Sequence, residues 1–173
     1  MKKFTKGLLT LGVLAAMSLM AAEDTTILVT TFNDEDGENP SQCSLREAVT
    51  AASTHQPYGG CPKGDKHASN VKTIQLEAGT YVLKRELTPN SPLYIVGKEP
   101  ADYSKPNAIN NDYPAKTKLK TTISGQGAAR LFNTINLEKP SLTLENIVLA
   151  DGYSVDAGGA LLLGGNTELI NVV

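Results

Sequence analysis

The hydrophobic and polar positions of the chain predict many short strands and one helix. Residues 27–32 read as a first strand, which ends at the polar run 33–40. From residue 73 onward, β-branched and apolar stretches alternate with turns rich in Gly, Asn and Pro. The predicted strands are residues 73–76, 80–83, 93–96, 121–124, 141–144 and 168–171. No helical pattern separates these strands, so a sheet built from β-α-β units is disfavoured.

The predicted helix follows the polar run. Ser44 and Glu47 have the spacing of a capping box, in which each side chain binds a backbone N–H that the first helical turn leaves unpaired. An apolar face is formed by Leu45, Ala48, Val49 and Ala52. The charged Arg46 and Glu47 are therefore expected to point outward, together with Thr50, and the helix is expected to cap a larger structure.

An internal repeat favours a solenoid. Residues 144–148 and 169–173 align at an offset of 25 residues, which stacks Asn146 over Asn171 and allows a ladder of side-chain amides. A weaker alignment joins residues 95–97 to 123–125 at an offset of 28. A solenoid turn buries its inward residues against neighbouring turns, so a period in the twenties fits this architecture. A β-sandwich is the alternative, but its strand spacing is shorter.

One long polar insertion interrupts this rhythm. Residues 98–120 carry Tyr103 and Tyr113 among Asn, Pro and Lys, and these two rings are candidate ligand contacts unless they pack within their own loop. The chain ends inside a predicted strand. We therefore expect either a longer open reading frame or another molecule that covers this edge.

The first residues have the pattern of a secretory signal peptide. Lys2, Lys3 and Lys6 precede an apolar run over residues 8–20, and small residues follow before Glu23. The run is too short for a membrane span, which needs about 20 apolar residues. We expect residues 1–22 to be removed, leaving an exported chain without a transmembrane helix. The predicted parts are then a capping region over 23–72 and a repeat region over 73–173.

Charge argues against a nucleic-acid partner. Removing residues 1–22 takes away three of the 16 Lys and Arg residues and none of the 18 Asp and Glu residues, so the mature chain is acidic. Binding to DNA or RNA rests on clustered basic side chains, and no basic stripe is present.

The two cysteines predict a disulfide. Export delivers Cys43 and Cys61 to an oxidising compartment, where thiols pair. A zinc site that also used His55 and His67 is the alternative, but its spacings lack the close pairs of zinc ligands. No other cofactor is indicated, although calcium is possible in the acidic run, and its candidate ligands are Asp34 and Asp36.

Residues 43–48 read Cys-Ser-Leu-Arg-Glu-Ala, and here the chain resembles the CSLREA domain found at the start of exported β-helix proteins. Residues 73–81 are similar to the segment that opens the first turn of such proteins. Residues 156–161 are similar to the Gly-Gly-Ala repeats of polymorphic outer-membrane proteins and other autotransporter passengers. Repeat and resemblance together predict an all-β fold, a right-handed parallel β-helix with a short N-terminal helical cap.

This resemblance implies a secreted or surface-exposed protein with an adhesin-like binding or structural role, whose partner would be a carbohydrate or a host or cell-surface protein. The enzymatic alternative is a polysaccharide lyase or glycoside hydrolase of the pectate-lyase-like fold, because fold alone does not assign function. Its candidate residues Arg130, Asp151 and Asp156 are scattered along the sequence. A Ser/His/Asp hydrolase is less favoured, since both histidines lie in the polar stretch after the helix.

Overall fold

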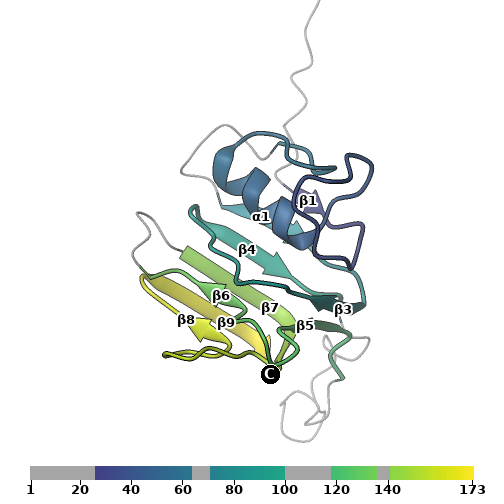
Figure 1. Ribbon diagram of the computed structural model, residues 1–173. Coiled ribbons are helices and arrows are strands. Elements are labelled where there is room, and N and C mark those ends of the chain that lie inside the picture. The colour runs from purple at the N-terminus through teal and green to yellow at the C-terminus, as the bar shows by residue number, and fades with distance from the viewer. Residues whose placement is uncertain (1–25, 64–70, 100–117, 136–140) are drawn as a thin grey trace, which may run out of the picture.

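The computed structural model describes residues 26–63, 71–99, 118–135 and 141–173 (Figure 1). The elements in chain order are β1 (Thr26–Leu28), α1 (Leu45–Thr54), β2 (Lys72–Gln75), β3 (Gly79–Val82), β4 (Leu93–Val96), β5 (Thr121–Ser124), β6 (Phe132–Asn133), β7 (Ser141–Ala150), β8 (Leu161–Leu162) and β9 (Asn166–Val172). The predicted signal peptide lies outside the described residues, as do Tyr103 and Tyr113 of the 98–120 insertion.

Seven strands form one sheet in the order β1-β2-β4-β7-β5-β3, and β9 pairs with β7. The pairings between the named strands of the described segments are parallel. The long strand β7 joins two branches, because Leu142 pairs with Leu93 of β4, whereas Ile147 pairs with Thr121 of β5. Figure 1 shows the strands following one another from β1, beside α1, through β4 and β7 to β9.

The prediction of an all-β right-handed parallel β-helix is wrong. The sheet curls into a half-barrel and does not close as a β-helix solenoid, and with α1 packed against it the fold is not clearly all-β. The strand β7 bends at Asn146, which adopts a left-handed conformation with φ 57°. The bend allows one continuous strand to pair with both β4 and β5. Such a residue turns a strand without ending it, as Asn and Asp tolerate positive φ. Beside this sheet lies a separate pair of two-residue strands, β6 and β8.

The predicted 25-residue repeat is confirmed by the strand register. Leu144 of β7 pairs with Leu169 of β9, and the side-chain amide of Asn171 donates a hydrogen bond of 2.7 Å to the Asn146 amide oxygen. The alignment at an offset of 28 is wrong, because Ile95 pairs with Leu144 whereas Ile123 pairs with Leu149 on the other branch. The two asparagines therefore mark the bend that β7 and β9 share.

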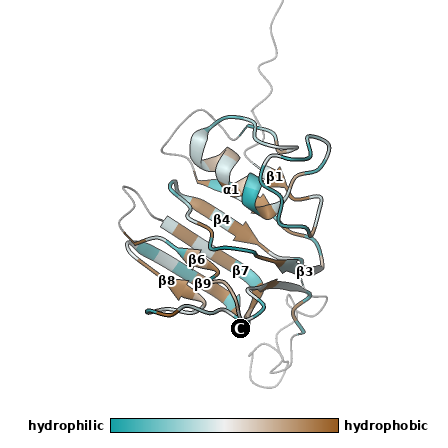
Figure 2. Cartoon of the chain, in the orientation of Figure 1, coloured by the Kyte–Doolittle hydropathy of each residue, from teal (hydrophilic) through white to brown (hydrophobic). Residues whose placement is uncertain are grey.

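The core lies on the inner face of the curled sheet. Ile27, Ile74, Ile95 and Leu144 occupy one line of paired positions and are buried. Each such side chain contributes about 1.5–3 kcal/mol through its burial. The small face of α1, made by Ala48, Ala51 and Ala52, is part of the same core. Figure 2 shows β4 coloured as hydrophobic along most of its length, whereas α1 carries a hydrophilic stretch.

Candidate functional site

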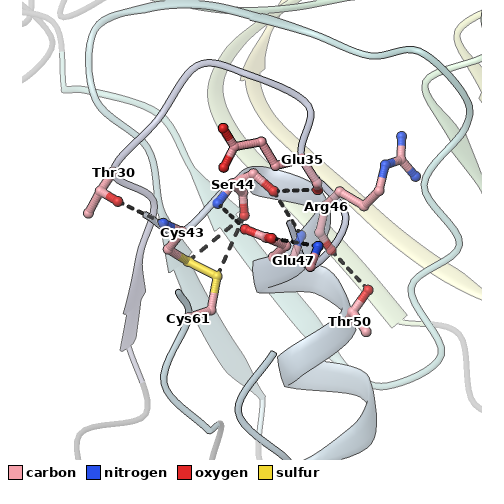
Figure 3. Close-up of a disulfide and its surroundings, with 9 residues drawn as sticks. Thr30, Glu35, Cys43, Ser44, Arg46, Glu47, Thr50 and Cys61 are labelled. Carbon is pink, nitrogen blue, oxygen red and sulfur yellow. Dashed lines mark hydrogen bonds between the residues drawn. A yellow bond between two sulfur atoms is a disulfide. The ribbon is translucent and has the colours of Figure 1, made fainter. Parts of the chain in front are cut away.

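A disulfide fixes the start of α1. Cys43 and Cys61 are bonded and buried, and the Cys43 N–H donates a hydrogen bond of 2.8 Å to Thr30 Oγ1 (Figure 3). The disulfide excludes these sulfurs from the alternative zinc site. His55 forms the C-cap of α1 with φ 57° rather than lying in an ordinary solvated loop, and His67 lies outside the described residues. Across the described segments, no three His, Cys, Asp or Glu side chains gather in a way that could hold a metal ion.

The predicted capping box is confirmed. Ser44 Oγ accepts a hydrogen bond of 3.2 Å from the Glu47 N–H, and Glu47 Oε2 accepts one of 2.9 Å from the Ser44 N–H. The second carboxylate oxygen of Glu47 accepts a bond of 2.8 Å from the Gly37 N–H. Glu47 is therefore fully buried and does not point outward as predicted. It joins the helix to the acidic turn.

Arg46 is also buried, contrary to the prediction. Its Nε and Nη2 atoms each lie 2.8 Å from an oxygen of Asp34, and the two side chains are only 5% and 2% exposed. Arg46 also donates to the carbonyls of Arg85 and Glu86, and the Lys84 N–H donates to Asp34 Oδ2 at 2.7 Å. The pair thus ties the acidic turn, α1 and residues 84–86 together. Hydrophobic periodicity did not predict this ion pair. The one sequence feature that could have indicated it is the carboxylate of Asp34, which lies 12 residues before Arg46.

The structure places both calcium candidates against guanidinium groups. Asp34 holds Arg46, and Asp36 forms an ion pair with the side chain of Arg85. Asp36 also accepts a hydrogen bond of 3.2 Å from the Tyr58 hydroxyl, and this bond raises the pKa of Tyr58. Calcium binding at this turn stays a prediction. It requires Asp34 and Asp36 to release the guanidinium groups of Arg46 and Arg85 and to bind the ion instead.

The residues considered for lyase chemistry are engaged separately. Arg130 donates to Glu86 Oε2 at 2.7 Å, to Ser154 Oγ at 2.6 Å and to the Gly158 carbonyl at 2.8 Å. Asp151 accepts a weaker bond of 3.3 Å from Ser124, and Asp156 is exposed. Arg130 therefore fastens the loop after β7 to the segment before β6, which is a structural role.

A groove of about 490 Å³ lies between the acidic turn and the outer side of β3, which ends one branch of the sheet. Its lining combines an aromatic ring, an aliphatic side chain, an amide, a hydroxyl and charged groups of both signs. The lining residues are Phe32, Asn33, Asp34, Glu35, Thr80, Val82 and Lys84. The volume lies within the range of small-ligand sites, while the lining is more polar than is usual for them.

The Phe32 ring, which lines this groove, packs against Tyr81. The Phe32 ring centroid lies 4.9 Å from that of Tyr81, and the ring crosses Gly79 so closely that an added Cβ would lie 2.4 Å from its Cε1 atom. Burial raises the pKa of Tyr81, whose hydroxyl oxygen accepts a bond of 2.9 Å from the Glu77 N–H. Phe32 nevertheless remains 46% exposed, so a fixed aromatic surface borders the groove.

Glu35 lines the groove, and one of its two carboxylate oxygens has no hydrogen-bond partner among the described residues. Its Oε2 atom is withdrawn from solvent and makes no hydrogen bond within the described part of the chain. Its backbone carbonyl accepts a bond of 2.8 Å from Ser44 Oγ, so the capping serine also positions this residue. Figure 3 shows the Glu35 carboxylate pointing away from Ser44 and Glu47. Unsatisfied buried polar atoms are rare in native proteins and often indicate a missing partner.

A second cavity of about 210 Å³ lies between α1 and residues 85–88. Arg46 and Arg85 both line it, but Asp34 and Asp36 already neutralise these two cations. The groove beside Phe32 is therefore the better candidate for a ligand site.

Fold and site together describe a small, disulfide-stapled scaffold of parallel strands with a ligand-sized groove at its N-terminal end. No protein-family model, curated protein or solved structure matches the chain. Among the described helices, none is long and apolar enough to cross a membrane. The disulfide is compatible with an exported protein.

Proposed function

We propose that this protein is exported and acts at the cell surface or outside the cell as a binding protein, in the manner of an adhesin or an autotransporter passenger. The observation that carries the proposal is the groove beside Phe32, where a half-exposed aromatic ring and the Glu35 side chain line one cavity. Exposed aromatic surface next to polar groups is a common feature of recognition sites.

The anchoring of the groove supports this proposal. Three contacts fix the chain around residues 33–37: the Asp34–Arg46 ion pair, the bond from Ser44 to the Glu35 carbonyl and the bond from Gly37 to Glu47. The Lys84 N–H bonds to Asp34, which fixes the opposite wall. A site that is rigid before binding loses less conformational freedom on binding, and its affinity is higher for that reason.

Attachment of the purified, oxidised protein to cells tests the proposal. Labelled protein is incubated with bacterial and animal cells, and the bound fraction is compared for the wild type, Phe32→Ala and Leu28→Ala. Leu28 is the matched control, because it is also about half exposed but does not line the groove.

We expect saturable attachment that falls at least tenfold in Phe32→Ala and is unchanged in Leu28→Ala, as a central aromatic contact contributes more than about 1.4 kcal/mol. Absence of saturable attachment to any surface contradicts the binding role. Equal attachment by all three proteins contradicts the groove as the site. Fractionation of cells that express the chain with and without residues 1–22 tests export.

A further inference from the structure

We infer that the ligand of the Phe32 groove is an uncharged saccharide and that Glu35 accepts a hydrogen bond from one of its hydroxyl groups. This inference rests on the proposed function and assigns a ligand class to the same site. It follows from the chemistry of the lining, which includes the Glu35 side chain, and from the fixed position of the ring.

The lining matches the two kinds of surface that a sugar ring presents. Phe32 and Val82 offer apolar surface to the C–H groups of a sugar, while Asn33, Thr80 and Lys84 offer hydrogen-bonding groups to its hydroxyls. A lipid chain needs an apolar lining throughout, and a nucleic acid needs clustered cations. Neither requirement is met here, because five of the seven lining residues are polar and Lys84 is the one cation among them.

The Phe32 ring is positioned for stacking. Tyr81 contacts it at a ring separation of 4.9 Å with an interplanar angle of 52°, and Gly79 provides the space that the ring occupies over β3. Any side chain at position 79 would push the ring away, and the φ of 152° at Gly79 also favours glycine. The supported ring therefore keeps its exposed part available to a ligand without rearrangement.

Glu35 selects for a hydrogen-bond donor. Its side chain lines the groove, and a carboxylate accepts hydrogen bonds but donates none. A sugar hydroxyl supplies such a donor. A sugar carboxylate would instead place a second negative charge near the Glu35 carboxylate, which is unfavourable.

The test uses the full oxidised chain and a defined panel of probes. The methyl glycosides of glucose, galactose, mannose and N-acetylglucosamine represent uncharged sugars, and the methyl glycoside of galacturonic acid, as its sodium salt, and N-acetylneuraminic acid represent anionic ones. Binding is measured by isothermal titration and by saturation-transfer NMR for the wild type, Phe32→Leu, Glu35→Gln and Glu168→Gln. Glu168 is the matched control because it is an exposed glutamate on β9 that does not line the groove.

We expect at least one uncharged glycoside to bind, with affinity at least tenfold lower in Phe32→Leu and Glu35→Gln and unchanged in Glu168→Gln. Circular dichroism melts identify any variant that fails to fold. For such a variant, protection of Phe32 by the sugar in hydroxyl-radical footprinting of the wild type replaces the affinity measurement, and lack of protection overturns the inference. Binding of anionic sugars alone, or of no sugar, also overturns it. If the sugar inference fails but cell attachment still depends on Phe32, the proposed binding function stands. If cell attachment is absent as well, the inference and the proposed function both fail.

Discussion

Removal of the Asp34 carboxylate tests the central contact of the N-terminal region. In Asp34→Asn the side chain keeps its size, but Arg46 becomes a buried cation without a counter-charge. Both side chains are nearly inaccessible to solvent, at 2% and 5% exposure, so the small values typical of surface ion pairs do not apply. Breaking a buried pair in this way costs about 3–5 kcal/mol.

The neighbouring hydrogen bonds set the expectation for the double variant. The double variant Asp34→Asn/Arg46→Met removes both buried charges. It also leaves the carbonyls of Arg85 and Glu86 without the hydrogen bonds that Arg46 donates to them. Each carbonyl left without a donor costs about 1 kcal/mol, at the lower end of the usual range. We therefore expect the double variant to cost about 2 kcal/mol, which is less than either single change.

Urea denaturation followed by circular dichroism measures these free energies of unfolding, with equal m-values as the condition for comparing them. The control is Arg130→Met, which removes a guanidinium outside the N-terminal region but leaves Asp34 paired. If Asp34→Asn and Arg46→Met each cost under about 1 kcal/mol, the pair behaves as a surface contact and this reasoning is refuted. Additive single costs would likewise refute the coupling.

Four further outcomes are expected. Cys43→Ser lowers the free energy of unfolding by about 3 kcal/mol, given the sequence separation of 18 between the cysteines, and an unchanged melting temperature would contradict this. Ser44→Ala costs about 1 kcal/mol, measured in urea, while Ser44→Thr retains most of the cap. Asn171→Ala costs about 1 kcal/mol by removing the amide ladder to Asn146, whereas exposed Glu168→Gln, as its control, changes little. The bond from the Asp36 N–H lowers the pKa of Glu38, so the stability it adds is present above the ordinary glutamate pKa and is lost as the pH falls through the lowered value. NMR of the Asp36 amide follows that loss, and an amide signal that ignores the titration would contradict it.

Short-range patterns predicted the local structure around α1. The spacing of Ser44 and Glu47 predicted the capping box, because the geometry of a helix start depends only on residues within one turn. The cysteines predicted a disulfide from compartment and number. The 25-residue repeat predicted which residues of β7 and β9 stack, since similar segments pair in register when their apolar positions face one core.

Only the tertiary structure decided how the strands close and where the groove lies. The repeat suggested a closed solenoid, but the bend at Asn146 keeps β7 continuous between two branches of one curled sheet. The sequence pattern places Phe32 at the end of a strand, whereas its position at the groove depends on its contact with Tyr81, which is far along the chain. Contacts between distant segments leave no periodic signal in a single sequence.

The hydrophobic pattern of the sequence predicted which apolar positions of α1 are buried, and it predicted that the charged positions face solvent. Arg46 and Glu47 are buried because Asp34 and the Gly37 N–H, ten or more residues earlier in the chain, satisfy their polar atoms. A charged side chain enters a core only when such partners are in place, since an unpaired buried charge is strongly unfavourable. The partners are brought into place by the fold, and for this reason the sequence pattern could not assign these two residues.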